Sequence, residues 1–245
     1  MPEAERYQRE ADFHDRTFEQ HSRATVQRFY TITGASRRVY RDLITSTCAG
    51  QAVLEYGCGP GSYAFDLAER GARVIGIDIS PVAIELARNS ASERGLDIRF
   101  SVMNAESLDL PDGSFDIVCG TGILHHLDLA RGIVEVRRVL KVGGRAVFLE
   151  PLGHNPIINW YRRRTPQLRS VDEHPLRMDD LALIGRHFDH MTVRMFHLTT
   201  LAAVPLRKAP GFPAIVSALD VIDRRLFGLL PSLRKHAWSC LIEVS

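Results

Sequence analysis

Short apolar runs alternate with segments of helical periodicity between residues 52 and 150 of this chain. The apolar runs predict five strands, over residues 52–56, 73–78, 98–102, 115–120 and 145–150. The periodic segments between them carry helix end signals and predict helices over residues 63–70, 81–94 and 129–140. Strands that alternate with helices in this way form a parallel sheet with right-handed crossovers. We therefore expect an α/β fold with a doubly wound, mostly parallel sheet.

The two flanks of this alternating region have different patterns. Residues 1–47 are polar with scattered aromatic residues, and they predict two or three helices that lie outside the core as a lid. After the fifth strand the alternation stops, and weaker apolar runs predict two more strands over 191–198 and 237–244. We expect a core over residues 48–151, with residues 152–245 adding substrate-side insertions, a helical one among them, and the last two strands to the same domain.

The composition is that of an ordinary globular protein, and it limits the classes of partner. Hydrophobic residues make up 45% and charged residues 24% of the 245 positions, and the net charge is +2. Such a balance favours neither nucleic acid nor a membrane as a partner, and no apolar run is long enough to span a bilayer. The four cysteines lack zinc-ligand spacing, and four scattered thiols in a chain of this length are typical of a reducing compartment. We expect a cytoplasmic protein with a small-molecule partner, and the apolar stretch 201–230 leaves a homo-oligomer open.

A glycine-rich turn after the first predicted strand carries the strongest chemical signal. The sequence reads VLEYGCGPG over residues 53–61, so Gly57 and Gly59 allow a tight turn and the next helix begins with exposed amide groups. Asp78 ends the next strand, about 20 residues further on, where a carboxylate can bind both hydroxyls of a ribose. Together they predict a pocket for an adenosine-like group at the carboxyl ends of the strands.

Glu55 distinguishes between two kinds of adenosine-containing ligand. A dinucleotide-binding turn usually reads G-x-G-x-x-G and exposes amide groups to a pyrophosphate. Here the glycine spacing differs, and Glu55 precedes the turn. A carboxylate at this place repels a pyrophosphate and attracts an ammonium group. The pattern therefore favours a ligand with a positive amine, such as the methionine part of S-adenosylmethionine.

Four further segments complete a series of motifs: GIDIS, NAESLDLPDGSFDIV, GILHHL and LKVGGRAVFLEP. In order and spacing, the series resembles the motifs of class I S-adenosylmethionine-dependent methyltransferases, and in particular small-molecule members of type 11/25. The resemblance covers residues 50–151. It implies a Rossmann-like sheet of seven strands whose last strand is antiparallel and inserted next to the fifth. The weak strands over 191–198 and 237–244 fit the sixth and seventh places.

The resemblance assigns contacts with the methionine and ribose parts of the cofactor. Gly57 and Gly59 would pass beside the methionine part, and Glu55 would lie near its amine. Asp78 would hold the ribose.

The resemblance also assigns contacts with the adenine and the sulfonium. Ile79 would pack on the adenine, and Asn104 with the Ala105 amide would read its edge. Most relatives have Asp at position 104, and Asn keeps the acceptor oxygen. Gly120, at the end of the fourth strand, would lie beside the reacting sulfonium.

The residues after the fourth strand narrow the acceptor class. Enzymes that methylate exocyclic amines of bases or glutamine amides carry an Asn/Asp-Pro-Pro-Tyr/Phe signature there, whereas this chain reads CGTG over residues 119–122. Metal-dependent catechol-type members need carboxylates around the same place. Because Cys119 and Gly120 cannot serve as such ligands, we predict no metal.

Three histidines are candidates for catalysis. His125 or His126, at the carboxyl edge of the sheet, could act as a general base because the pKa of histidine lies near neutrality. The alternative is that one of them caps or packs against the following helix. His154 and Asn155 follow the fifth strand and could orient a substrate, or Asn155 could stabilise a turn before Pro156.

Candidates for acceptor contact lie on both flanks. Arg163 belongs to a run of three arginines that forms either a solvated helix face or an anion-binding lid. Tyr7, His14 and Tyr30 belong to the N-terminal segment, which in the family often folds over cofactor and substrate. Simple helix packing is the alternative for these three residues.

The combined pattern predicts direct in-line methyl transfer from S-adenosylmethionine to a small, apolar secondary metabolite or lipid-like acceptor. Two alternatives keep the same cofactor: an RNA or protein methyltransferase, and a partner subunit that binds the cofactor without turnover. A nicotinamide-dependent dehydrogenase is a third, which Glu55 and the glycine spacing disfavour.

Overall fold

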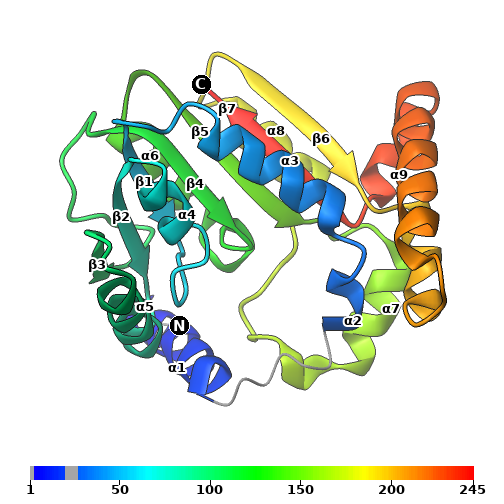
Figure 1. Cartoon of the computed structure of the whole chain (residues 1–245), viewed down its shortest axis with the longest axis horizontal. Helices are drawn as coiled ribbons and strands as arrows, with labels where there is room; N and C mark the ends of the chain where they lie inside the picture. The colour runs from blue at the N-terminus through cyan, green and yellow to red at the C-terminus, as the bar shows by residue number, and fades with distance from the viewer. Residues whose placement is uncertain (1–2, 20–26) are drawn as a thin grey trace.

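A computed structural model describes residues 3–19 and 27–245 of the chain (Figure 1). Its centre is a seven-stranded sheet in the order β3-β2-β1-β4-β5-β7-β6. The strands are β1 (Ala52–Tyr56), β2 (Arg73–Asp78), β3 (Arg99–Val102), β4 (Phe115–Thr121), β5 (Leu140–Pro151), β6 (Met191–Phe196) and β7 (Ser239–Val244). All seven predicted strands are therefore confirmed.

One strand of the sheet runs against the others. The strands β1 to β5 pair in parallel, whereas β7 lies between β5 and β6 and is antiparallel to both. Ile242 of β7 pairs with Phe148 of β5 on one side and with Val193 of β6 on the other. The expected doubly wound sheet, with its last strand inserted next to the fifth, is confirmed. Strand order reverses beside β1, where open α/β sheets bind ligands.

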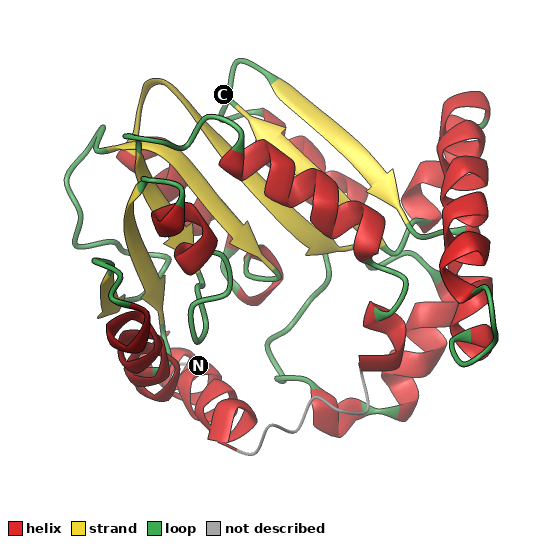
Figure 2. Cartoon of the chain, in the orientation of Figure 1, coloured by secondary structure: helices red, strands yellow, loops and turns green. Residues whose placement is uncertain are grey.

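Helices cover the sheet and extend beyond its edge (Figure 2). They are α1 (Glu3–Glu19), α2 (Gln27–Tyr30), α3 (Gly34–Thr45), α4 (Ala64–Glu69), α5 (Pro81–Arg94), α6 (Leu129–Val139), α7 (Pro156–Arg164), α8 (Met178–Gly185) and α9 (Phe212–Leu229). The expected helical insertion before the last strand is α9 with short 3₁₀ turns at both of its ends. No helix in the described ranges is long and apolar enough to cross a membrane.

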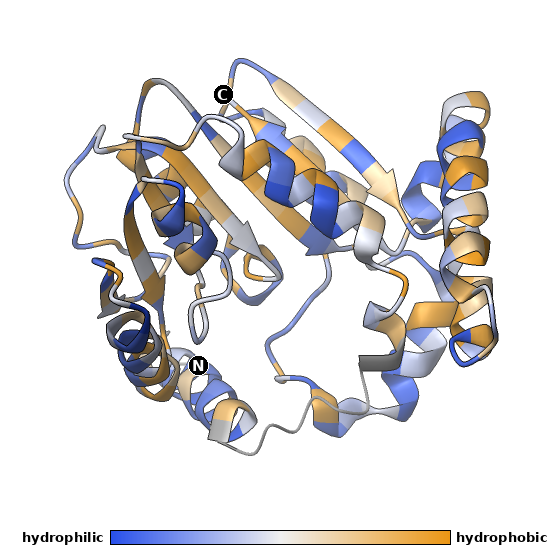
Figure 3. Cartoon of the chain, in the orientation of Figure 1, coloured by the Kyte–Doolittle hydropathy of each residue, from blue (hydrophilic) through white to orange (hydrophobic). Residues whose placement is uncertain are grey.

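The core is divided by the sheet into two apolar layers, because successive strand residues point to opposite faces. Val53 of β1 packs in the layer with α3, α4 and α5, and Leu54 packs in the layer with α6 and α8. Both residues are fully buried. In Figure 3 the central strands are correspondingly apolar, whereas the edge strand β6 and the helices are apolar on part of their surface.

The prediction that residues 1–47 lie outside the core is wrong for α3. This helix lies against the sheet, and Tyr40 and Ile44, four residues apart on one face, are fully buried in the same layer as α4 and α5. Burial of that apolar face stabilises the helix on the sheet. By contrast, α1 packs against α5 beside the carboxyl ends of the strands.

Candidate functional site

A cavity of about 250 Å³ lies at the carboxyl ends of β1, β2 and β4. Gly57 and Gly59 form its floor with φ angles of 69° and 53°, a left-handed conformation that glycine adopts without strain. Between them, the Cys58 amide donates to the Ile77 carbonyl over 2.8 Å and holds the loop against β2. The volume of the cavity is slightly below the range of small-ligand pockets, which begins at about 300 Å³.

Asp78 and Ile79 line the cavity where β2 ends. The Asp78 carboxylate accepts one hydrogen bond from the Gly59 amide over 2.8 Å and another from the Ser80 amide over 2.9 Å. Ser80 in turn caps α5, since its hydroxyl accepts a bond from Ala83. These bonds hold the carboxylate in place without placing any cationic side chain against it among the described residues.

Asn104 and Ala105 line the opposite wall. The Asn104 side-chain oxygen accepts a bond from the Glu106 amide over 2.9 Å, which fixes its orientation. Gly120 lies behind the cavity rather than in its lining. A Cβ atom at Gly120 would lie 2.6 Å from the Tyr56 carbonyl oxygen and 2.8 Å from the Ile123 side chain, so only glycine fits between β4 and the end of β1.

The structure places Glu55 behind the glycine loop. Its carboxylate is buried and accepts bonds from the Ser62 hydroxyl (2.7 Å) and the Tyr63 and Ala64 amides (2.9 and 2.8 Å). It therefore holds the start of α4, and its side chain does not line the cavity. Burial raises the pKa of Glu55 to about 7, although these three bonds oppose that shift. Its predicted contact with an amine remains a prediction.

The two adjacent histidines have different surroundings. The His125 ring is buried, and its Nδ1 lies 2.7 Å from Oε2 of Glu150. The other Glu150 oxygen accepts bonds from the amides of Ile123 and Leu124, so Glu150 shapes the loop after β4. His126, in contrast, lines the cavity, and its Nδ1 lies 3.1 Å from Oε2 of Glu10. Burial lowers the pKa of His126.

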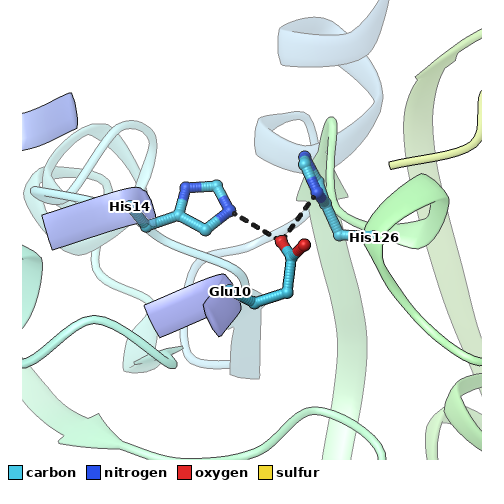
Figure 4. A group of neighbouring side chains, drawn as sticks. All are labelled: Glu10, His14 and His126. Carbon is cyan, nitrogen blue, oxygen red and sulfur yellow. Dashed lines mark hydrogen bonds and ion pairs between the residues drawn. The ribbon is translucent and has the colours of Figure 1, made fainter. Parts of the chain in front are cut away.

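The helix α1 closes the cavity. Tyr7, Glu10, His14 and Phe18 of this helix belong to the lining, so the structure brings the predicted Tyr7 and His14 to the site. The Tyr7 hydroxyl donates to Glu106 over 2.9 Å, and the Arg6 guanidinium donates to the same buried carboxylate. Figure 4 shows Glu10 between His14 and His126.

Besides Glu55, Gly120 and His125, four more predicted residues lie outside the lining of this cavity: Tyr30, His154, Asn155 and Arg163. Asn155 is buried and caps α7, since its side-chain oxygen accepts bonds from the Ile157 and Ile158 amides and its nitrogen donates to the His236 carbonyl. This is the turn-stabilising role that was the alternative for Asn155. His154 accepts a bond from the Met178 amide over 3.2 Å at the start of α8.

The arginine run at the end of α7 has mixed surroundings. Arg162 is paired with Glu173, and Arg164 lies over the Trp160 ring at 4.2 Å from its centroid. Arg163 between them is exposed. Tyr30 is 42% exposed and lies beneath the Arg37 guanidinium.

Sequence reasoning missed Glu10, Glu106 and Glu150. Each is a buried carboxylate whose partners come from distant parts of the chain, for example Arg6 and Asp128 around Glu106. Only Glu150 carries a signal in the sequence, because it ends an apolar strand at the edge where ligands bind.

A family model described as a methyltransferase domain matches residues 54–148. Among curated proteins, a demethylmenaquinone methyltransferase of Thermus thermophilus is 40% identical over 105 residues, covering 42% of this chain and 48% of that protein. The aklanonic acid methyltransferase DauC of a Streptomyces species is 40% identical over 114 residues, covering 44% of this chain and 52% of that protein. The chain thus spans about half the length of these relatives.

The fold likeness extends further than the sequence match. Phosphoethanolamine N-methyltransferase 2 of Haemonchus contortus superposes on this chain with a TM-score of 0.68 and 17% identity. The superposition covers 96% of this chain and 59% of the Haemonchus contortus chain. At that identity the likeness concerns the fold alone.

Proposed function

We propose that this chain is a class I S-adenosylmethionine-dependent methyltransferase that methylates a small acceptor, because residues 54–148 match a methyltransferase-domain model and the motifs predict this family. The observation that carries the proposal is the joint lining of one cavity by Gly57, Gly59, Asp78 and Asn104. These residues come from three loops, and they present the backbone, carboxylate and amide groups that an adenosyl ligand requires.

The residues present fit S-adenosylmethionine at this site. Gly57 would face the methionine part, Asp78 would bind the ribose hydroxyls, and Asn104 with the Ala105 amide would bind the adenine edge. Ile79 supplies an apolar surface for the adenine ring. When bound, the cofactor supplies an electrophilic methyl group on a sulfonium.

Glu55 would attract the amine of the cofactor's methionine part electrostatically, without touching it, from behind the glycine loop. Its buried carboxylate lies under the start of α4, and its negative charge favours a cation above the glycine turn. With its pKa at about 7, Glu55 is close to half-ionised at neutral pH. A nearby ammonium group would favour the ionised form, because opposite charges stabilise each other.

The acceptor would enter on the α1 side. A second cavity of about 310 Å³ lies between α1 and residues 167–172, and Glu10 lines both cavities. Its lining combines the apolar Phe13 and Val171 with the cationic Arg16 and with Asp172, which is paired with Arg9. This mixture supports an acceptor with an apolar body and an acidic or oxygen-rich end, as in a secondary metabolite or lipid-like compound.

The chain's own contribution is to orient the acceptor and to exclude water. The helix α1 covers the cavity and is fastened by Arg6 and Tyr7 to the buried Glu106. Positioning the acceptor atom in line with the methyl group supplies much of the rate in such a transfer. His126, with Glu10 at its Nδ1, is the predicted base that lies nearest to that space.

Calorimetric titration with S-adenosylhomocysteine, with NAD as a parallel ligand, tests the cofactor. We expect binding of the first and no heat from the second, and the reverse result would overturn the proposal. Transfer of label from methyl-labelled S-adenosylmethionine in a cell extract then tests the acceptor. Label in a small organic product supports the proposal, whereas label in RNA or protein, or no transfer at all, supports the corresponding alternative.

A further inference from the structure

Two histidines and a glutamate from distant parts of the sequence meet at the mouth of the cofactor cavity (Figure 4). Glu10 and His14 are four residues apart on α1 and therefore share one face of the helix. His126 comes from the loop after β4. One carboxylate oxygen, Oε2 of Glu10, lies 3.1 Å from Nδ1 of His126 and 3.5 Å from Nε2 of His14.

The spacing of these three side chains matches that of ligands around one metal ion. One potential ligand atom from each residue lies within 4.8 Å of the other two. Two ligand atoms bound about 2.1 Å from a single tetrahedral ion lie about 3.4 Å apart. The two separations around Glu10 are close to that value, so the three side chains can converge on one ion with small movements.

Glu10 supplies a second, independent observation. The residue is only 4% exposed, and its other oxygen, Oε1, has no hydrogen-bond partner among the described residues. Within the described ranges, its ion-pair partners are the two histidines, and no Lys or Arg contacts it. A buried carboxylate with this environment is costly unless a cation compensates its charge.

We propose that Glu10, His14 and His126 bind a divalent transition-metal ion at the mouth of the cavity. Two imidazoles and one carboxylate suit Zn²⁺, Fe²⁺, Co²⁺ or Ni²⁺, whereas Mg²⁺ and Ca²⁺ prefer oxygen ligands throughout. Three protein ligands leave coordination positions open for water or an acceptor, as in catalytic rather than structural metal sites.

A neighbouring group, His125, His126 and Glu173, satisfies the same distance criterion and shares His126. It is the weaker candidate because its members have other partners. His125 lies against Glu150, and Glu173 is paired with both Arg162 and Arg169. The Glu10 group is therefore the one whose carboxylate has no Lys or Arg ion-pair partner among the described residues.

The role of this ion rests on the proposed function. An acceptor hydroxyl bound to the ion would release its proton to solvent more readily, since a divalent cation lowers the pKa of a bound O–H group. That oxygen would then form a bond to the methyl carbon while the carbon–sulfur bond breaks, and S-adenosylhomocysteine would leave with the electron pair. The ion would take over the role of a base from His126, and no group changes its oxidation state.

This proposal departs from the prediction of a site without metal. That prediction considered the residues after β4, where Cys119 and Gly120 offer no carboxylate. The donors Glu10 and His14 lie more than a hundred positions earlier in the sequence, and only the fold places them beside His126.

Titration of the full-length, untagged and chelator-treated protein with Co²⁺ tests the site, with visible absorption and calorimetry as readouts. We expect one Co²⁺ per chain and a d–d absorption band of an ion with nitrogen and oxygen ligands. His14→Gln should weaken binding by at least about tenfold, because loss of even an outer partner of a metal ligand has effects of that size. His190→Gln, an exposed histidine on the loop before β6, is the matched control and should bind as the unmodified chain does.

Circular dichroism and the unfolding midpoint should show that His14→Gln is folded. Glu10→Gln, which keeps the shape of the side chain and removes its charge, should also lose the band. Absence of a one-to-one complex, or equal Co²⁺ affinity in His14→Gln and His190→Gln, would overturn the proposal and leave a hydrogen-bonded triad. Titration with S-adenosylhomocysteine is a separate experiment. A protein that binds Co²⁺ but does not bind S-adenosylhomocysteine would reject the proposed function and retain the metal site.

Discussion

The carboxylate of Asp78 accepts a hydrogen bond from the backbone amide of Gly59, with Oδ2 and N 2.8 Å apart. The end of β2 and the glycine loop after β1 are therefore joined at the wall of the cavity. The same side chain that is expected to hold a ribose also orders the loop that is expected to hold the methionine part. Loss of the Asp78 charge should consequently affect both parts of the ligand.

We predict that Asp78→Asn weakens binding of S-adenosylhomocysteine by about tenfold or more. A hydrogen bond to a charged group contributes about 1.5–3 kcal/mol, and the amide cannot accept from two ribose hydroxyls as the carboxylate does. Calorimetric titration measures the change. The control is Asp97→Asn, at an exposed position before β3, which should bind normally. Equal affinities in the two variants would reject the assignment of Asp78.

Gly120→Ala should destabilise the fold and weaken cofactor binding together. The added Cβ would lie 2.6 Å from the Tyr56 carbonyl oxygen, and it would press on Ile123, which lines the cavity. Overpacking of this kind costs about 1–3 kcal/mol. Chemical denaturation and ligand titration are the measurements.

Gly228→Ala is the matched glycine control. Apart from the adjacent residues and the backbone of α9 itself, no described atom lies within 4 Å of a Cβ at this position, so alanine should raise stability by about 0.5–1 kcal/mol. A Gly120→Ala protein as stable as this control would show that β4 and β1 tolerate a side chain there.

Asn155→Ala should lower stability by about 1–2 kcal/mol and leave cofactor affinity unchanged. The substitution removes the cap of α7 and leaves the His236 carbonyl without its Asn155 partner. Asn89→Ala, at an exposed position inside α5, is the control and should be as stable as the unmodified chain or slightly more stable. Normal stability combined with a raised KM for the acceptor would instead favour the predicted substrate contact.

The buried acid Glu55 should make stability depend on pH. Its pKa is about 7 in the folded chain, compared with an ordinary value of 4.5 that applies after unfolding. Between these values the folded state holds a proton that the unfolded state releases. The free energy of unfolding should therefore fall as pH rises from about 4.5 to 7, by up to about 3 kcal/mol from this residue.

Denaturant titrations at several pH values between 5 and 8 measure this dependence. Glu150 has the same direction of shift, because burial also raises its pKa to about 7. The variant Glu55→Gln should keep the contribution of Glu150 and lose that of Glu55, so its curve should be flatter. An unchanged slope would mean that Glu55 is ionised in the folded chain over the whole range.

Local sequence was sufficient for the strands, for the capped helix α5 and for the position of Gly59 and Asp78 at the cavity, but not for Glu55, whose side chain lies behind the glycine loop. Apolar runs of four to seven residues lie in the centre of a parallel sheet because both faces are covered. Ser80, Pro81 and Gly95 mark the ends of α5 by backbone chemistry that acts within a few residues. Gly59 and Asp78 lie close together because parallel strands end at one edge.

Tertiary structure alone decided what the N-terminal helices do. The periodicity of α3 does not reveal whether its apolar face packs on a sheet or on another helix, and the packed structure places Tyr40 and Ile44 in the core. Glu10 and His126 are 116 positions apart, and nothing in the spacing of their neighbours predicts that they meet. A carboxylate and an imidazole interact over a few ångströms, so their contact depends on where α1 docks, which the whole fold determines.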